Sequence, residues 1–498
     1  MPPSVTLDGR SLTLADVVAV ARDAARVAVA GEAVKRAERS RKVVERAAAG
    51  DAPVYGINTG FGKLAHVRIP PDQLLQLQRN LILSHCVGVG PPLPVAVVRA
   101  VMLLRANVLL KETSGVRAVL AQRLVDFLNA GIHPVVPEQG SVGASGDLAP
   151  LSHIARALMG EGEVDYGGRV PATAALKQAG IAPLEFHAKE GISFINGTQA
   201  QTAILALLVH DARILWRTAH AAAAMSLEAL RGTPVPFDER IHAARPHPGQ
   251  IQSAALLREL LAESEIRESH RHNDPRVQDA YSLRCTPQIL GPVADAVEFA
   301  ARTAEIELNA ATDNPLVFGD DILSGGNFHG QSVALALDVL AIALTTLAGI
   351  AERRIEALLN PDLSQGLPPF LTPNAGLQSG LMMIQVMAAA LVAECRSLCV
   401  AASVQSIPTD ANQEDVVPMG MAAAMKARRI LANVQRIVAA ELICGAQGLE
   451  FLKPLKPGRG VARVHAQVRK LAAPLDEDRA LSDDIERVAA AVASEAMA

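Results

Sequence analysis

Residues 198–230, TQAQTAILALLVHDARILWRTAHAAAAMSLEAL, form the stretch that decides the fold of this chain. Apolar residues recur at helical spacing along its whole length, and neither glycine nor proline interrupts it. Such a helix is much longer than the ordinary mean of about 11–12 residues. Its apolar positions are too many for one buried stripe, so we expect a helix that is covered on several sides, as in a bundle.

The same pattern recurs further along the chain, at residues 293–312, 330–359, 379–403 and 421–449. Of all residues 50% are hydrophobic but only 3% are aromatic, so the apolar mass is Ala, Leu and Val. Ala and Leu favour helices, whereas sheets are richer in aromatic and β-branched residues. The sequence therefore predicts a mainly α fold with a long central helical bundle.

The N-terminal part has a different, loop-rich character. Residues 12–49 predict two amphipathic helices that end at Gly31 and Gly50, and the rest of this part mixes loops, short strands and helices. With 498 residues the chain exceeds the usual size of one hydrophobic core. We predict two domains, an N-terminal mixed domain at 1–200 and the long-helix bundle with C-terminal helices at 201–498.

Bulk charge and cysteine usage exclude several classes of protein. The net charge of −4 gives no electrostatic reason to bind nucleic acid or an anionic membrane. Five cysteines without a C-x-x-C pair predict reduced thiols in a cytoplasmic protein. The N-terminus lacks the pattern of a secretory signal, and Asp338 interrupts the apolar stretch at 332–350, so we expect no membrane span.

Three polar breaks separate the long helices, at residues 269–284, 313–331 and 405–420. Breaks in a bundle gather at its ends, where a site could be assembled. In the first break Gln278, Tyr281 and Arg284 share one face if the segment is helical, and the arginine suits a carboxylate ligand. A hydrogen-bond patch between helices explains the three residues equally well.

The last break contains Gln413 and Glu414. A carboxylate in a buried break can accept a hydrogen bond from a ligand N–H, although a solvated loop acid is an equal alternative.

Residues 59–65, TGFGKLA, fit a weak dinucleotide signature. Pro70 and Pro71 would stop the helix that this signature needs, and no acid stands near residue 82, so we reject that interpretation. A mobile glycine-rich loop that carries Tyr55 is the better interpretation, with an ordinary surface turn as the alternative.

Two further chemistries are disfavoured. Residues 143–147, GASGD, place Asp147 where a nucleophile elbow requires glycine, which argues against a hydrolase. His247, His270 and His272 lack the further ligands that zinc needs, so we interpret them as solvated or capping residues and expect no metal.

Residues 140–150, GSVGASGDLAP, combine small residues in a way that suits a reaction of the backbone itself. In a tight turn the amide nitrogen of Gly146 can approach the carbonyl carbon of Ala144, since Gly has no Cβ in the way. Loss of water closes a five-membered ring, and loss of the Ser145 hydroxyl leaves a methylidene group. The product, 4-methylidene-imidazol-5-one, is an electrophile that ordinary side chains do not supply.

The segment GSVGASGDLAPLSH and seven other motifs resemble the aromatic amino acid ammonia-lyases, in that family's order and over nearly the whole chain. The seven are YGINTGFGKLA (55–65), LQRNLILSHCVGVG (77–90), AKEGISFINGTQ (188–199), VQDAYSLR (277–284), TDNPLVF (312–318), SGGNFHG (324–330) and ANQED (411–415).

The resemblance implies a lyase that captures the amine of its substrate on the methylidene-imidazolone formed autocatalytically from Ala144, Ser145 and Gly146. Tyr55 would remove the β-proton, and its pKa of about 10 must then be lowered, with helix ends and Arg284 as candidate causes. The other implied roles are orientation of cofactor and amine by Asn196 and Tyr281, binding of the carboxylate by Arg284, and lining of the site by Gln278 and Phe328. The family also implies a homotetramer whose sites draw on three subunits.

Two polar pairs, Ser84–His85 and Gln413–Glu414, favour an imidazole substrate. A phenyl ring would leave such buried groups unpaired, at about 1–3 kcal/mol each. The resemblance is therefore greatest to the branch that converts L-histidine into trans-urocanate and ammonia, the first step of histidine degradation. A tyrosine or phenylalanine lyase, a 2,3-aminomutase and a helical scaffold without catalysis are the alternatives.

Two segments depart from that branch. Val416 and Pro418 stand where it usually has His and Ser, and CVAASVQSIPT at 399–409 also differs from its usual pattern. Because these changes adjoin Glu414, they bear on the substrate range.

Overall fold

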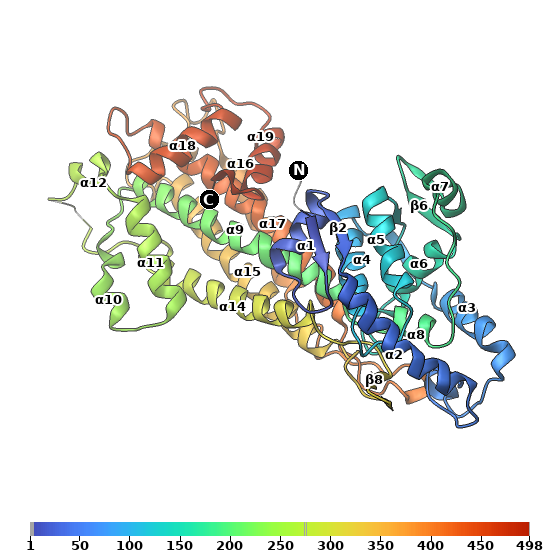
Figure 1. Cartoon of the computed structure of the whole chain (residues 1–498). Coiled ribbons are helices and arrows are strands. Elements are labelled where there is room, and N and C mark those ends of the chain that lie inside the picture. Colours follow the sequence, from blue (N-terminus) through green and yellow to red (C-terminus); the bar gives the residue numbers. More distant parts are fainter. Residues whose placement is uncertain (1–3, 273, 275, 498) are drawn as a thin grey trace. The chain divides into compact units, whose positions relative to one another are not determined.

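The computed structural model describes residues 4–272, 274 and 276–497 (Figure 1). It consists of two compact units, each made of three stretches of chain. Unit 1 comprises Met1–Leu207, Ala300–Asp338 and Ala401–Met425, and unit 2 comprises Leu208–Phe299, Val339–Val400 and Lys426–Ala498. These units differ from the two contiguous domains predicted at 1–200 and 201–498, because the polar breaks at 313–331 and 405–420 fold with the N-terminal part.

Five long helices confirm the mainly α fold. They are α9 (Gln199–Ala229), α14 (Thr286–Glu307), α15 (Gln331–Leu359), α16 (Met382–Leu398) and α17 (Gly420–Glu450). Buried polar contacts link them within unit 2, where Trp216 of α9 donates to the carbonyl of Leu290 in α14 over 2.7 Å. Ser226 of α9 likewise donates to Glu441 of α17 over 2.8 Å. The apolar residues outside a single helix face are thus covered by neighbouring helices.

Helix α15 bears on the expectation that no segment of the chain spans a membrane. By length and composition it could cross a membrane, since one 18-residue window has a mean hydropathy of 2.2. A single acid such as Asp338 does not lower the mean hydropathy of so long an apolar run below that of a membrane helix. However, 67% of that window is buried inside the structure, as in the core helix of a globular protein.

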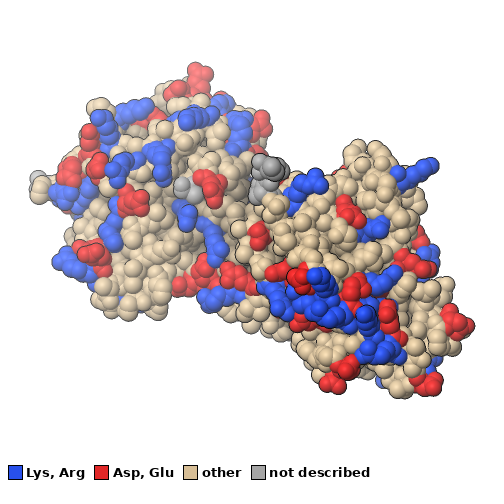
Figure 2. All heavy atoms as spheres, viewed as in Figure 1, with Lys and Arg blue, Asp and Glu red and all other residues tan. Residues whose placement is uncertain are grey.

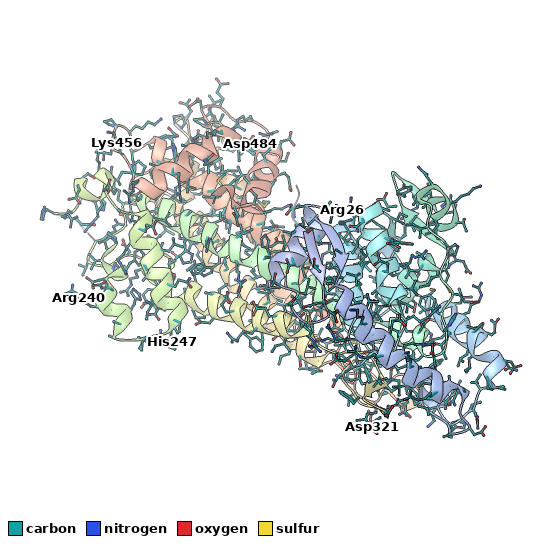
Figure 3. All side chains as sticks on the ribbon, in the orientation of Figure 1. Arg26, Arg240, His247, Asp321, Lys456 and Asp484 are labelled. Carbon is teal, nitrogen blue, oxygen red and sulfur yellow. The ribbon has the colours of Figure 1, made fainter. Side chains whose placement is uncertain are left out.

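Unit 1 begins with strand β1 (Ser4–Leu7), which pairs in parallel with β2 (Arg26–Val29). Helix α1 (Leu14–Arg22) lies between them in sequence and starts with a capping box of Thr13 and Asp16. Helix α2 spans Gly31–Ala49, so Gly50 ends a helix as predicted, whereas Gly31 begins one. The prediction for Gly31 was wrong because a short strand, with Val27 buried and Arg26 exposed (Figure 3), occupies the space between the two helices.

The remaining helices and strands of unit 1 are 15 residues long or shorter. They are α3 (Leu74–His85), β3 (Val89–Pro92), α4 (Val95–Leu109), α5 (Val119–Ala130), β4 (His133–Pro134), β5 (Pro137–Gln139), α6 (Leu148–Leu158), β6 (Glu163–Asp165), β7 (Arg169–Pro171), α7 (Ala172–Ala179), α8 (Glu190–Ile195), β8 (Leu316–Phe318) and β9 (Asp321–Leu323). Helix α4 is buried over almost its whole length and packs against α1 and α5. Helices α3, α6 and α8 pack against one another, and this group carries much of the site described below.

Unit 2 adds shorter helices to its parts of the long ones. They are α10 (Glu239–Ala243), α11 (Pro248–Leu260), α12 (Glu265–Ser269), α13 (Tyr281–Arg284), α18 (Arg459–Leu471) and α19 (Ser482–Val492). Helix α18 packs against α11 and α19, and Asp484 of α19 (Figure 3) pairs with Arg479 and Arg487.

The charged residues are mixed on the face shown in Figure 2. Along α2, Lys and Arg side chains lie among Asp and Glu. This arrangement agrees with the small net charge of −4.

Candidate active site

The glycine-rich segment forms a tight turn directly before α6. A β-bridge joins Gly143 to Gly146, so Ala144 and Ser145 are the two central residues of the turn. Both glycines have a φ of +75°, in the left-handed region that favours glycine. The turn is anchored on both sides, because Gly330 donates to the carbonyl of Gly143 over 3.0 Å and Asp147 donates to that of Gly197 over 2.7 Å.

Gly146 packs directly against the backbone of Gly197, to which a second β-bridge joins it. A Cβ on Gly146 would collide with the backbone atoms of Gly197. The absence of a side chain at 146 is therefore a packing requirement as well as a conformational one. A side chain at 146 would thus obstruct the packing of the turn, while the approach of the Gly146 nitrogen to the Ala144 carbonyl stays a prediction.

Asn196, the residue after α8, holds the turn from the other side. Its Nδ2 donates to the carbonyl of Ser145 over 2.6 Å, and its Oδ1 is buried without a partner among the described residues. The buried guanidinium of Arg105 in turn donates to the carbonyl of Asn196 over 3.2 Å and to Gln199 over 2.5 Å. Arg105 thus fixes the backbone that presents the Asn196 amide.

Arg105, which lies among apolar residues of α4, is not one of the residues predicted from the sequence. The sequence does contain a signal for Arg105, because this cation stands inside the apolar run VAVVRAVMLLRANVLL and is fully buried. A buried charge is paired or hydrogen-bonded, so such a residue is expected to hold a neighbouring segment in place.

Glu414 contacts Ser145 directly. The hydroxyl of Ser145 donates to Oε1 of Glu414 over 2.5 Å, and the hydroxyl of Thr409 donates to Oε2 over 2.5 Å. The backbones of Thr409 and Glu414 are also paired, at 2.9 and 3.3 Å. Two hydrogen bonds therefore hold the Glu414 carboxylate in place, and its contact with a ligand stays a prediction.

Asp147, next to the turn, is fully buried. It accepts hydrogen bonds from the backbone and side-chain amides of Gln201, at 2.9 and 3.1 Å. Burial raises the pKa of its carboxyl to about 6, although these hydrogen bonds oppose the shift. Asp147 ties the turn to the first residues of α9.

Tyr55 lies on the loop between α2 and α3. Its hydroxyl oxygen accepts a hydrogen bond from the amide of Gly62 over 3.4 Å, and its ring lies edge-on to Phe61. The loop is closed against residues 410–412, because the amide of Lys63 donates to Asp410 over 3.1 Å. A Cβ on Gly62 would collide with the Asp410 carboxylate, so this glycine permits the close approach.

The predicted role of Tyr55 as a base requires a lowered pKa, but within one chain the pKa of Tyr55 is raised. Burial raises the pKa of the phenol, and the negative charges of Asp410 and Glu414 raise it further. The hydrogen bond from Gly62 lowers it. Arg284, named as a candidate cause of lowering, belongs to unit 2 and is not among the groups that act on Tyr55.

Ser84 and His85 end helix α3. The Nδ1 atom of His85 lies 2.8 Å from the carbonyl of Leu81, and the Ser84 hydroxyl donates to the same carbonyl over 3.0 Å. A carbonyl only accepts, so Nδ1 donates in this contact, and a singly protonated ring then has its acceptor at Nε2. Ser84 and His85 thus form a polar wall at the end of α3.

Two adjoining cavities of unit 1, of about 550 and 630 Å³, bring the predicted residues together. Tyr55, Ser145, Phe328 and Glu414 line both of them. Ala144 and Gln413 line the first cavity, and Ser84, His85 and Asn196 line the second. Apolar side chains such as Phe61, Leu81 and Leu148 complete the second cavity, which suits a flat ring with polar ends.

Gln278, Tyr281 and Arg284 are not brought into these cavities. They belong to unit 2, where Gln278 is exposed and Tyr281 keeps 69% of its surface in solvent. The Arg284 guanidinium stacks over the Tyr281 ring at 4.8 Å, and its Nε is buried without a partner among the described residues. Tyr281 and Arg284 thus lie on one face of α13, as predicted. Binding of a substrate carboxylate by Arg284 stays a prediction.

Val416, one of the two departures noted in the sequence, lines the first cavity beside Gln413 and Glu414. Its carbonyl lies 3.0 Å from Nε2 of His329, a cavity residue that the sequence analysis did not single out. No group of three His, Cys, Asp or Glu side chains in the described part of the chain could hold a metal ion.

Comparison with known proteins agrees with this geometry. The family model for aromatic amino acid lyases matches residues 12–470. The chain belongs to the aromatic amino acid lyase family. A curated relative, the histidine ammonia-lyase of Koribacter versatilis, is 52% identical over 98% of this chain and 97% of its own.

Two solved structures of relatives have the same fold. The histidine ammonia-lyase of Trypanosoma cruzi is 42% identical with a TM-score of 0.91 and covers 99% of this chain and 94% of its own. The tyrosine aminomutase of Streptomyces globisporus is 40% identical with a TM-score of 0.94 and covers 99% of this chain and 97% of its own. Lyases and aminomutases thus share this lyase-family fold.

Proposed function

We propose that this chain eliminates ammonia from L-histidine to give trans-urocanate. The observation that carries the proposal is the turn at Ala144–Ser145, held by Asn196 and Glu414 at the floor of a cavity that Tyr55 and His85 also line. The histidine ammonia-lyases that are 50–52% identical to the chain over nearly its whole length support the choice of substrate.

The residues around the turn fit a 4-methylidene-imidazol-5-one made from Ala144, Ser145 and Gly146. Gly146 leaves the space that a flat ring needs against Gly197, and the Asn196 amide donates to the carbonyl that the ring would keep. When formed, this group supplies an electrophile that makes the substrate amine a better leaving group. Asn196 Oδ1, buried without a partner, is placed to accept a hydrogen bond from the substrate ammonium.

The imidazole of the substrate would face the polar wall of the second cavity. His85 presents an acceptor at Nε2, which matches the N–H of a neutral imidazole, and Ser84 lies beside it. Glu414 Oε1 is bonded to the Ser145 hydroxyl, and once that hydroxyl is lost the oxygen can accept a substrate N–H. A phenyl ring has no donor for these acceptors, so histidine is preferred.

Tyr55 is the proposed base for the β-proton of the substrate. The Gly62 amide fixes its hydroxyl, and the Phe61 ring limits the movement of its own ring. Because the chain itself raises the pKa of Tyr55, the cation that lowers it must come from the substrate or from another subunit.

We further propose a cytoplasmic homotetramer in which another subunit supplies Gln278, Tyr281 and Arg284 to the site. The exposure of Gln278 and Tyr281 in the single chain supports this arrangement. Arg284 would then bind the substrate carboxylate in bidentate fashion.

A 2,3-aminomutase is the second candidate, favoured by the 40% identity to a tyrosine aminomutase across the whole fold. Such an enzyme would return ammonia to the β-carbon instead of releasing it.

Product analysis of the purified protein with L-histidine tests both candidates. The expected products are urocanate and free ammonia in equal amounts, whereas a β-amino acid would identify the mutase. The mass of the peptide spanning 140–153 should be lower than the sequence predicts by two waters, and Ser145→Ala should abolish both this loss and the activity while the protein stays folded. An active enzyme with an unmodified Ala-Ser-Gly peptide would refute the proposal.

A further inference from the structure

We propose that Glu414 is the acid–base catalyst that removes the Ser145 hydroxyl when the ring forms. The inference rests on the proposed function and assigns to Glu414 a role that precedes any contact with substrate. Its basis is the 2.5 Å hydrogen bond between Ser145 Oγ and Glu414 Oε1, because Oγ is the atom that must leave.

The first dehydration needs no side chain to take part covalently. The amide nitrogen of Gly146 bonds to the carbonyl carbon of Ala144, and the carbonyl oxygen leaves as water with the two amide protons of Ser145 and Gly146. A C=N bond between Ala144 and Ser145 completes the five-membered ring. Ser145 still carries its hydroxyl at this stage.

The second dehydration is where a positioned carboxyl group acts. The Cα–H bond of Ser145 breaks and its electron pair forms the Cα=Cβ bond, while the Cβ–Oγ bond breaks. The Glu414 carboxylate first takes up the Cα proton, relayed by solvent water, and then passes this proton to Oγ. Oγ leaves with it as water, so that the net loss is one water and the Glu414 carboxylate is regenerated.

The structure holds Glu414 in place for this transfer. The Thr409 hydroxyl binds Oε2, the oxygen that does not contact Ser145, and the two backbones are paired in both directions. Between them Asp410, Ala411 and Asn412 all have positive φ, which folds the chain back so that residues 409 and 414 meet. Left-handed conformations in three successive residues are costly and persist only where the surroundings enforce them.

Asp415 provides a matched control. It lies next to Glu414 and lines the same cavity, and the hydrogen bond of the Ser145 hydroxyl goes to Glu414 and not to Asp415. Both residues can be changed to the amide with the same loss of charge and almost no change in shape.

The test is the mass of the 140–153 peptide in full-length protein, after circular dichroism has established that each variant is folded. Wild type and Asp415→Asn are expected to lack two waters. Glu414→Gln is expected to lack at most one, because the ring closes but the hydroxyl stays. Loss of two waters in Glu414→Gln, to the wild-type extent, would overturn the inference.

A second variant covers the case in which Glu414→Gln does not fold. Thr409→Val removes the hydrogen bond to Oε2 but keeps the shape and the backbone pairing, so the second dehydration should be several-fold slower when the peptide mass is followed after cell-free synthesis. A rate equal to that of wild type would count against Glu414. Failure of the wild-type chain itself to lose water would instead refute the proposed function.

Discussion

At the scale of single residues, Asp410 acts on Tyr55 in two ways. Its carboxylate accepts the Lys63 amide and so closes the loop that carries Tyr55, and its negative charge raises the pKa of the phenol. As a base, Tyr55 works in its deprotonated form, so this pKa sets the acid limb of the pH–rate profile.

We predict that Asp410→Asn moves that limb to lower pH. The amide oxygen still accepts from Lys63, but the charge that raises the pKa of Tyr55 is gone, and the expected shift is less than about one pH unit. The measurement is kcat/KM for L-histidine against pH. Asp415→Asn, whose carboxylate is not among the groups acting on Tyr55, should leave the limb in place; equal shifts in both variants would contradict the assignment.

His85 is predicted to control substrate choice. In His85→Leu the imidazole of the substrate loses its acceptor, so kcat/KM for L-histidine should fall by roughly 10–200-fold, corresponding to about 1–3 kcal/mol. Activity with L-phenylalanine should fall much less or rise. If both substrates lost the same factor, His85 would be a structural residue.

At the scale of elements, the turn before α6 is predicted to be intolerant of any side chain at Gly146. Alanine there meets the backbone of Gly197 and must keep a φ of +75°, so the cost should exceed about 3 kcal/mol. Gly167, in the hairpin between β6 and β7, has a φ of +68° but open space around it. Gly167→Ala should cost only about 1–2 kcal/mol.

Chemical denaturation of the two variants gives the comparison. Gly146→Ala is also expected to leave the 140–153 peptide without its two-water loss, whereas Gly167→Ala should mature normally. Similar midpoints for the two variants would mean that φ alone, and not the contact with Gly197, matters.

Two ion pairs of helix α17, one buried and one exposed, allow a prediction about the bundle. Arg354 of α15 binds Glu441 with both side chains fully buried, whereas Arg436 binds Glu486 with 36% and 59% of the side chains exposed. Arg354→Met should destabilise the protein by about 3–5 kcal/mol because it leaves a buried carboxylate unpaired. Arg436→Met should cost at most about 1 kcal/mol, again by denaturation.

The long helices were predictable because their apolar periodicity extends over many turns, and α9 differs from the predicted range by one residue at each end. The role of Gly31 at the start of a helix was not predictable, since the four-residue strand before it is too short for its alternation to be told from the end of a helix. The roles of Arg105 and Thr409 were not predicted, for another reason. Their roles depend on contacts with residues far away in the chain, which no local pattern encodes.

At the scale of the whole molecule, the site is the least complete part of the prediction. Of the site residues that motif resemblance predicted, nine meet in the cavities of unit 1, but Gln278, Tyr281 and Arg284 do not. A linear motif carries no information about which subunit contributes it. Apolar side chains such as Ile342, Met383 and Val386 are each about half or more exposed, and another copy would cover them only if the proposed homotetramer forms.

Subunit mixing tests whether the site is shared. Ser145→Ala and Tyr281→Phe should each be nearly inactive, because one removes the electrophile and the other a group that orients the amine. If different subunits supply the two residues, tetramers formed by co-expression should regain about a quarter of the wild-type sites, those that combine an intact Ser145 with an intact Tyr281. Each variant purified alone and mixed without exchange of subunits is the control. If mixed tetramers, verified by mass, recovered no activity, both residues would belong to the site of one chain and the proposed sharing between subunits would be wrong.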